Sequence, residues 1–310
     1  MVFSDNAPSD NPISNAGAAL GRVLFYDARL SRTDRVACAS CHRQQFGFGD
    51  TARFSPGIFG RHSARHTLAL ANARFNDHGR FFWDERAGSL EAQVLEPIHD
   101  TLEMGMGLDG LERKLAATRY YPGLFAAAFG SPRVTRDGIS RALAQFVRAL
   151  ISADSRFDRV FATGGAPDYT RLTEPERAGL QLFNTSGCVN CHRTMTQFAD
   201  KPNNIGLDAV PPDTGAGQGR FKPASLRNVA VRPPYMHDGR FQSLEQVVEF
   251  YSTRVQNGPF LDPRLRGADG SPRRLNLTPE QRAALVAFLG SLTDPAFLRA
   301  AKFASPFACH

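Results

Sequence analysis

Two cysteine-histidine motifs limit what this 310-residue chain can fold into more than any other feature. Each motif is a Cys-x-x-Cys-His pentapeptide, and the six residues are Cys38, Cys41, His42, Cys188, Cys191 and His192. Three chemistries use such residues: half of a zinc site, a thioredoxin-like redox pair, and covalent attachment of a c-type haem. The fold has to be built around whichever group the motifs hold.

The rest of the pattern favours haem. A zinc ribbon places its two Cys-x-x-Cys pairs about 15 to 20 residues apart, whereas the pairs here lie in opposite halves of the chain. Distant zinc knuckles do meet in some folds, so spacing alone leaves zinc open. A redox pair needs no histidine after the second cysteine. Haem attachment uses every residue, because the thiols bond to the porphyrin and His42 and His192 bind iron as proximal ligands. The sequence therefore predicts two covalently attached haem c groups.

The fifth cysteine, Cys309, stands apart from this pattern. The position three residues before it is Pro306, so it has no partner in a Cys-x-x-Cys pair. We predict a free thiol without function, and a haem held by a single thioether bond is the alternative.

Composition is typical of a globular protein with a sizeable core: 42% of the residues are hydrophobic and 22% are charged. No apolar run approaches the ~20 residues that cross a bilayer, and residues 1–14 do not resemble a signal peptide. Either the protein is cytoplasmic or its numbering starts after a removed signal. The formal net charge of +7 comes mostly from scattered arginines, which indicates a solvated surface and not a nucleic-acid-binding face.

The surroundings of the two motifs repeat, which indicates an internal duplication. A predicted helix ending in Leu-Phe precedes each motif, at residues 24–25 and 182–183, and Thr173 and Thr278 begin capping-box patterns. Strand patterns are scarce, and residues 162–170 give the best linker signal. The sequence predicts a mainly α-helical fold of two cytochrome c-like haem domains with long ordered loops. These domains are residues 1–163 and 164–310.

Three further motifs resemble one protein family. They are FWDERAGSLEAQ (residues 82–93), the PxxxxxEMG element (Pro97 to Gly105) and LRNVAVRPPYMHDG (residues 226–239). In this order, and with the two haem motifs, they resemble the bacterial di-haem cytochrome c peroxidases, in particular the MauG-like branch. The resemblance covers residues from about 18 to 295, nearly the whole chain.

The resemblance implies roles around the N-terminal haem. Glu103 is implied as the acid–base residue above that haem, with Gln93 and Pro97 shaping its pocket. Trp83 is implied as an electron relay between the haems. Without the resemblance, Glu103 reads as a helix cap and Trp83, the only tryptophan, as a core residue.

Two positions separate the kinds of protein within the family. Tyr251 stands where classical members have a methionine ligand on the C-terminal haem and where MauG has a tyrosine. Periodicity alone makes Tyr251 an ordinary helix core residue, and Met236 is the rival ligand. Phe59 replaces a loop histidine that can close the first haem in classical members. A phenolate stabilises high-valent iron, whereas a thioether raises the haem potential. These positions favour the MauG type, with an open first haem and a six-coordinate second haem.

The family also has a calcium ion between its domains. It uses an asparagine near the position of His66 and carbonyl groups near Arg232 and Pro234. His66 departs from that pattern, so the resemblance leaves calcium open.

We therefore expect a periplasmic di-haem oxidoreductase that takes hydrogen peroxide as acceptor, forms high-valent haem iron and oxidises a protein partner by long-range electron transfer. Because haem c is attached outside the cytoplasm, we take an export signal to have been removed. Two alternatives stay open. One is a cytochrome c peroxidase that scavenges peroxide with electrons from a small cytochrome or a cupredoxin. The other is a non-catalytic di-haem electron-transfer protein. We expect neither nucleic acid binding nor a membrane span.

Overall fold

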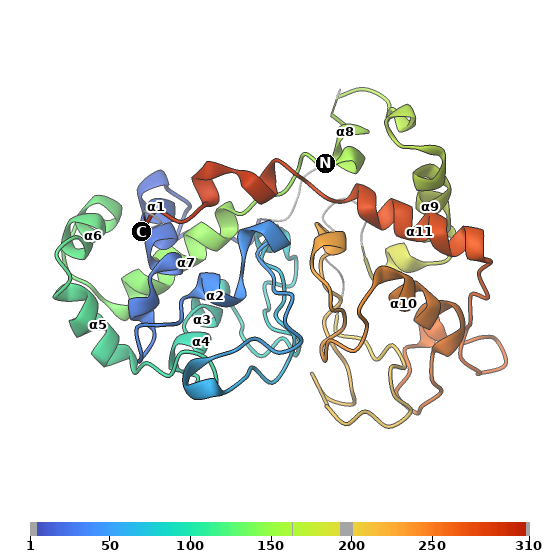
Figure 1. The fold of residues 1–310 in the computed structure, drawn as a ribbon, viewed down its shortest axis with the longest axis horizontal. Coiled ribbons are helices and arrows are strands. Elements are labelled where there is room, and N and C mark those ends of the chain that lie inside the picture. The colour runs from blue at the N-terminus through green and yellow to red at the C-terminus, as the bar shows by residue number, and fades with distance from the viewer. Residues whose placement is uncertain (1–4, 163, 193–200, 308–310) are drawn as a thin grey trace. The chain divides into compact units, whose positions relative to one another are not determined.

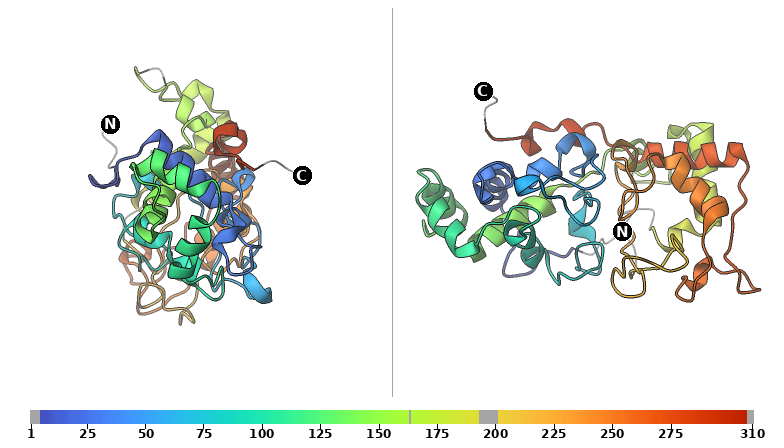
Figure 2. Two further views of the ribbon diagram at one scale, coloured as in Figure 1. Left: turned by 90° about the vertical axis from the view of Figure 1, so that its left-hand side faces the viewer. Right: turned by 60° about the horizontal axis from the view of Figure 1, so that its bottom comes forward.

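The computed structural model describes residues 5–162, 164–192 and 201–307. Within these ranges the regular structure is helical, and β pairing is limited to isolated bridges. Helices and long loops alternate along the chain, as Figure 1 shows and Figure 2 repeats from two further sides. The expected mainly α-helical fold is confirmed. No helix in these ranges is long and apolar enough to cross a membrane, and Cys309 lies outside the described residues.

The α-helices are α1 (Asn15–Tyr26), α2 (Cys38–Cys41), α3 (Leu90–Gln93), α4 (Glu96–His99), α5 (Leu108–Ala116), α6 (Tyr121–Phe129), α7 (Arg136–Ala149), α8 (Arg156–Arg159), α9 (Glu174–Thr185), α10 (Leu244–Glu249) and α11 (Pro279–Ser291). A π-helical turn, η8 (Phe250–Arg254), continues α10. Short 3₁₀ turns lie in the loops: η1 (Ala28–Leu30), η2 (Gln44–Phe46), η3 (Ile58–Gly60), η4 (Ala73–Phe75), η5 (Tyr169–Arg171), η6 (Cys188–Asn190), η7 (Val229–Val231), η9 (Pro263–Leu265), η10 (Phe297–Arg299) and η11 (Ala301–Phe303).

Capping groups begin two of these helices where the sequence predicts. Before α9, the backbone N–H of Thr173 donates to the Glu176 carboxylate (2.8 Å). Before α11, the backbone N–H of Thr278 donates to the side-chain oxygen of Gln281 (2.9 Å). Such pairs satisfy backbone groups that have no partner inside the helix. Both predicted helix starts are confirmed.

The chain divides into two compact units. The first comprises Met1–Arg80, Ala87–Ile151 and Leu298–His310, and the second comprises Phe81–Arg86 and Ser152–Phe297. The division differs from the predicted boundary between residues 163 and 164 in three places. The main boundary comes earlier, and two short segments each belong with the other unit.

The earlier boundary follows from where residues 152–160 pack. The Asp294 carboxylate accepts hydrogen bonds from the backbone N–H groups of Ala153 (3.0 Å) and Asp154 (2.9 Å). Phe157 is buried and its ring meets that of Phe288 edge-on, with centroids 5.6 Å apart. These residues therefore begin the second unit, although the strongest linker composition comes later.

Residues 298–307 follow the second unit in the chain but pack in the first. The Tyr26 hydroxyl donates to the carbonyl oxygen of Phe303 (2.9 Å), and the Gln44 side-chain amide donates to that of Ala300 (2.9 Å). The ring of Phe303 also meets the ring of Phe48, which is fully buried. This segment is a structural part of the first unit.

Each unit is built on two helices that touch backbone to backbone. In the first unit, a Cβ atom on Gly21 of α1 would lie only 1.9 Å from the carbonyl oxygen of Ala142 in α7. In the second unit, a Cβ on Gly179 of α9 would lie 2.0 Å from that of Ala284 in α11. Glycine is required at both crossings because no other side chain fits there. The two glycines occupy matching places in the predicted duplication.

Aromatic pairs repeat the same correspondence. The rings of Phe25 and Phe146 are 5.1 Å apart between centroids and tilted by 59°, while those of Phe183 and Phe288 are 5.1 Å apart and tilted by 55°. All four side chains are buried. Each pair lies where the helix before a haem motif packs on its partner helix, so the core of each unit supports the adjacent motif.

Candidate haem and active sites

The first motif forms the one-turn helix α2, and His42 follows it directly. The Nδ1 atom of His42 lies 2.9 Å from the carbonyl oxygen of Phe48, so Nδ1 carries the proton and donates it. Burial lowers the pKa of His42, although hydrogen bonds to backbone carbonyls act against it. The imidazole is therefore neutral near pH 7, and its Nε2 lone pair is available to a metal.

The second motif repeats this arrangement. Cys188 begins η6, and the Nδ1 atom of His192 donates to the carbonyl oxygen of Ala224 (3.1 Å). Burial lowers the pKa of His192 to about 4. Both histidines thus have one ring nitrogen fixed by the backbone and the other free of a proton, which suits an iron ligand.

The four motif cysteines are free thiols in half-buried positions. Burial raises the pKa of Cys38 to about 12 and that of Cys188 to about 11. A redox pair needs a lowered thiol pKa, so the thioredoxin-like interpretation fails. The described residues also contain no cluster of three or more His, Cys, Asp or Glu that could hold a metal ion. The zinc interpretation therefore has no site there, whereas paired thiols beside an oriented histidine fit covalent haem.

Glu103 acts electrostatically on the thiols of the first motif. Burial is the main cause of the raised pKa values of Cys38 (about 12) and Cys41 (about 11), and the Glu103 carboxylate contributes to both. Its side chain is half-buried. The acid–base role of Glu103 above the first haem stays a prediction.

A tight turn, residues 100–105, presents Glu103. The backbone N–H of Met104 donates to the carbonyl oxygen of Pro97 (3.2 Å), and that of Ile58 donates to the carbonyl oxygen of Glu103 (2.9 Å). Pro97, in α4, therefore fixes the turn through its main chain. Gly57 allows the Ile58 loop to approach, because a Cβ there would lie 1.9 Å from a carbonyl oxygen of the turn.

Phe59 lies in the same loop, in η3. Its φ of 56° is in the left-handed region, and its side chain is 69% exposed. An exposed large aromatic residue is one that the core does not use. Phe59 therefore points its ring to solvent and does not fill the space around Glu103.

Gln93 is the last residue of α3 and is half-buried. The helix is held on α7 by a two-pronged ion pair, because the Arg148 guanidinium donates to the two carboxylate oxygens of Glu91 (2.5 and 3.0 Å). Burial raises the pKa of Glu91, but hydrogen bonds from Arg148 and Asn11 outweigh it, and the pKa lies below its usual range. A charged pair thus fixes the helix that carries Gln93.

Tyr251 lies in the π-helical turn η8, where the sequence pattern predicts ordinary α-helix. Such turns are rare and occur frequently at functional sites. Burial raises the pKa of Tyr251, and the thiols of Cys191 and Cys188 add to this rise. The rival ligand, Met236, packs in the same small cluster as Tyr251, around the buried Phe250.

Trp83 belongs to the second unit and is half-buried. Its carbonyl oxygen accepts a hydrogen bond from the backbone N–H of Lys222 (2.8 Å). Its ring meets the ring of His237 edge-on, with centroids 6.4 Å apart, and His237 stacks on Phe221 at 3.6 Å. From the sequence, His237 is predicted to be a structural or propionate-contacting histidine and Lys222 has no predicted role, since nothing in their local pattern links them to residue 83.

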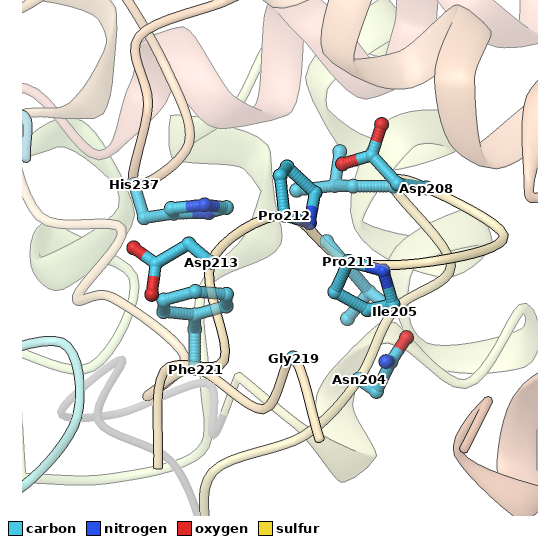
Figure 3. Close-up of a pocket in the computed structure, with 10 residues that line it drawn as sticks. Asn204, Ile205, Asp208, Pro211, Pro212, Asp213, Gly219, Phe221 and His237 are labelled. Atoms are coloured by element: carbon cyan, nitrogen blue, oxygen red, sulfur yellow. The ribbon is translucent and has the colours of Figure 1, made fainter. Parts of the chain in front are cut away.

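A small hollow, partly open to solvent, lies beside this stack. Figure 3 shows the rings of His237 and Phe221 on one side and Pro211 and Pro212 on the other. The lining of the hollow comes from residues 204–221 and from His237.

The residues at the calcium positions do not fit that ion. His66 is buried in the first unit, and its Nδ1 atom donates to the carbonyl oxygen of Ala52 (3.0 Å). Arg232 and Pro234 belong to the second unit. Calcium binds oxygen atoms, and an imidazole offers none where the family has an asparagine. We therefore assign no step to calcium.

Comparison with known proteins identifies the family of this chain. Residues 15–165 match the family model for di-haem cytochrome c peroxidase. The methylamine utilization protein MauG of Methylorubrum extorquens is 36% identical over 301 residues, which cover 93% of this chain and 82% of that protein. The chain belongs to the di-haem cytochrome c peroxidase and MauG family. Cytochrome c551 peroxidase of Nitrosomonas europaea is 33% identical, covering 75% of this chain and 71% of that protein.

A solved structure, described as a MauG-like protein associated with microbial copper homeostasis, resembles the whole chain. Its TM-score is 0.83 at 30% identity, covering 98% of this chain and 97% of that one. As a member of the di-haem peroxidase family, the chain is an oxidoreductase that acts on peroxide. The family uses two haem c groups, and the two motifs described above provide one attachment site each.

Proposed function

We propose that this protein is a periplasmic MauG-type oxidase, which uses hydrogen peroxide to oxidise a protein partner by long-range electron transfer. The observation that carries the proposal is the position of Tyr251. Tyr251 lies in a π-helical turn, and the thiols of Cys188 and Cys191 contribute to the rise of its pKa. An oxygen ligand at this place suits a haem that stores oxidising equivalents, whereas a thioether suits a haem that delivers electrons.

The haem iron supplies the centre at which peroxide is reduced and at which oxidising equivalents are held. His42 and His192 orient the two groups through their bonds to Phe48 and Ala224. Tyr251 would hold the iron of the second group through its phenol oxygen, and the positive charge of the iron would favour the phenolate form.

Glu103 moves a proton at the first site. Its carboxylate takes the proton from one peroxide oxygen and returns it to the other, which leaves as water. The main chain of the turn at residues 100–105, which carries Glu103, is held by hydrogen bonds with Pro97 and Ile58. Gln93 shapes the same pocket, and the outward-facing Phe59 leaves it accessible to peroxide.

Trp83 relays electrons between the two haems, so that both share the oxidising equivalents. A partner protein docked on the surface then supplies the electrons. We place the protein in the periplasm because haem c is attached to such motifs outside the cytoplasm. Cell fractionation tests this location, and mature haem-loaded protein in the cytoplasm would contradict it.

The ferric spectrum distinguishes the proposal from the electron-carrier alternative. We expect one high-spin haem with an open position and one low-spin haem, whereas a pure electron carrier shows two low-spin haems. Two low-spin haems would overturn the proposal. Rapid turnover of peroxide with a reduced small cytochrome as donor would favour the scavenging peroxidase, a role supported by the Nitrosomonas relative.

Replacing the acid–base residue tests the first site. Glu103→Gln should keep both haem spectra and slow the reaction with peroxide about 10²- to 10⁴-fold, the usual contribution of such a group. Glu96→Gln is the matched control, since the Glu96 side chain is 46% exposed in the nearby helix α4. An equal rate in wild type and Glu103→Gln, measured by stopped-flow absorbance, would remove Glu103 from the mechanism.

A further inference from the structure

The short segment that carries Trp83, residues 81–86, has a strained backbone. Phe82 has a φ of 70° and Glu85 a φ of 54°, both in the left-handed region that non-glycine residues avoid. Such a residue is energetically costly and persists only where the surroundings hold it. The segment also belongs to the second unit, although the chain before and after it belongs to the first. Contacts from the second unit therefore have to keep it in position.

Lys222, in the second unit, interacts with alternate residues of the segment, which are Phe81, Trp83 and Glu85. Its ammonium group lies 5.3 Å from the centre of the Phe81 ring, and its backbone N–H donates to the carbonyl oxygen of Trp83. The third link is electrostatic: burial lowers the pKa of Lys222 to about 8, and the charge of the Glu85 carboxylate acts against this. Lys222 is only 5% exposed and Glu85 only 6%. Charges buried this deeply are retained only where they are paired.

The other three residues of the segment, Phe82, Asp84 and Arg86, interact with one another. The Arg86 guanidinium lies 3.6 Å from the centre of the Phe82 ring and donates to the Asp84 carboxylate (2.9 Å). The Arg86 side chain is 47% exposed. The segment thus has a buried cation–ring–carboxylate set and an exposed one, and only the buried set has strong energetic consequences.

The chain around Lys222 also reaches the second haem motif. Two residues after Lys222, the carbonyl oxygen of Ala224 accepts the proton of His192 Nδ1 (3.1 Å). One stretch of three residues therefore holds the main chain of Trp83 at one end and the proximal histidine at the other.

We propose that the Lys222–Glu85 pair is the positioning element of Trp83, holding the relay at a fixed place relative to His192. This inference rests on the relay role proposed above. Lys222 and Glu85 are positioning residues, because they act through Trp83 and take no part in the proton transfer at the first site.

A double-mutant cycle on the haem-loaded protein tests the pair. Lys222→Met and Glu85→Gln each leave one buried charge without its counter-charge, and the double variant removes both. Hydrogen exchange of the amides in residues 81–86 should rise about 10- to 100-fold in each single variant. It should return close to wild type in the double variant. The rate at which the two haems share oxidising equivalents, after one equivalent of peroxide is added, should fall in each single variant. It should return close to the wild-type rate in the double variant.

Arg86→Gln is the matched control, since it breaks the exposed set on the same six residues. This variant should change the amide hydrogen exchange of residues 81–86 less than about twofold, because exposed ion pairs contribute little to stability. The reduction potential of the second haem should stay constant in all variants, since Ala224 still holds His192. If the reduction potential of the second haem shifts, the slower electron transfer between the haems follows from a changed driving force. That result would overturn the inference.

Trp83→Phe separates failure of the inference from failure of the proposed function. If oxidising equivalents pass between the haems at the wild-type rate in Trp83→Phe, then Trp83 is not the relay and the proposed function fails at this point. A second outcome would refute only the positioning role. In it, sharing between the haems is slow in Trp83→Phe, but the sharing rate and the amide hydrogen exchange are those of wild type in Lys222→Met and Glu85→Gln. Trp83 would then still be the relay. A double variant as slow as the single ones also refutes the positioning role, because the two charges would then not act as a pair.

Discussion

Gly57→Ala should disable the first site without touching any group that takes part in the chemistry. The added Cβ would lie 1.9 Å from the carbonyl oxygen of Leu102 and 2.8 Å from that of Glu103, whereas ordinary contacts begin at 3.4 Å. Both oxygens belong to the backbone, so no side chain can rotate away. The turn that carries Glu103 must withdraw by about 1.5 Å, given how closely protein interiors are packed.

This displacement sets the expected size of the effect. A catalytic group misplaced by about 1 Å costs about 10²-fold in rate, so the reaction with peroxide should slow by at least that factor. The hydrogen bond from Ile58 N–H to the Glu103 carbonyl oxygen should weaken at the same time. Overpacking should lower the free energy of unfolding by about 1–3 kcal/mol.

Stopped-flow absorbance of the ferric protein mixed with peroxide measures the rate, and the resting spectra check that both haems are in place. Gly88→Ala is the control, because a Cβ at Gly88 meets nothing within 4 Å. A wild-type rate in Gly57→Ala, or an equal loss in Gly88→Ala, would show that the turn does not set the position of Glu103.

Three further predictions concern other parts of the molecule. Tyr251→Met should raise the potential of the second haem, as measured by spectroelectrochemical titration; no shift there, with a shift in Met236→Leu, would make methionine the ligand. Glu91→Gln should lower the free energy of unfolding at pH 7 by about 3 kcal/mol, because Arg148 loses its buried partner. Because the folded pKa of Glu91 is lowered, this difference is present above the unfolded pKa of about 4.5 and is lost as pH falls through the folded one, so denaturant titrations should converge in acid. Gly179→Ala should force two helices apart and cost about 2 kcal/mol despite its better helix propensity; an unchanged denaturation midpoint would contradict the close crossing.

Features encoded locally could be predicted from the sequence. The capping pairs at Thr173 and Thr278 act within one turn of helix, so they appear in the structure where the sequence places them. The haem motifs combine thiols and histidine within five positions, and their chemistry follows from the residues alone. Glu103 was found through the family motif, and its role at the first site stays a prediction.

Features that depend on distant partners could not be predicted. The π-helical turn at Tyr251 interrupts a sequence pattern that fits an ordinary helix. The boundary after residue 151 depends on Asp294, which is far away in the chain. Lys222 looks like any surface lysine in the sequence, and only the fold shows that it is buried beside Glu85.

The placement of residues 298–307 has a consequence for the order in which the protein can be made. A nascent chain that has released residues 1–151 still lacks the segment whose backbone binds Tyr26 and Gln44. The first unit therefore completes its fold only after the second has been synthesised, which raises the sequence separation of its contacts and slows its closure. A fragment ending at residue 297 would keep every residue of the second unit and yet leave the first one open.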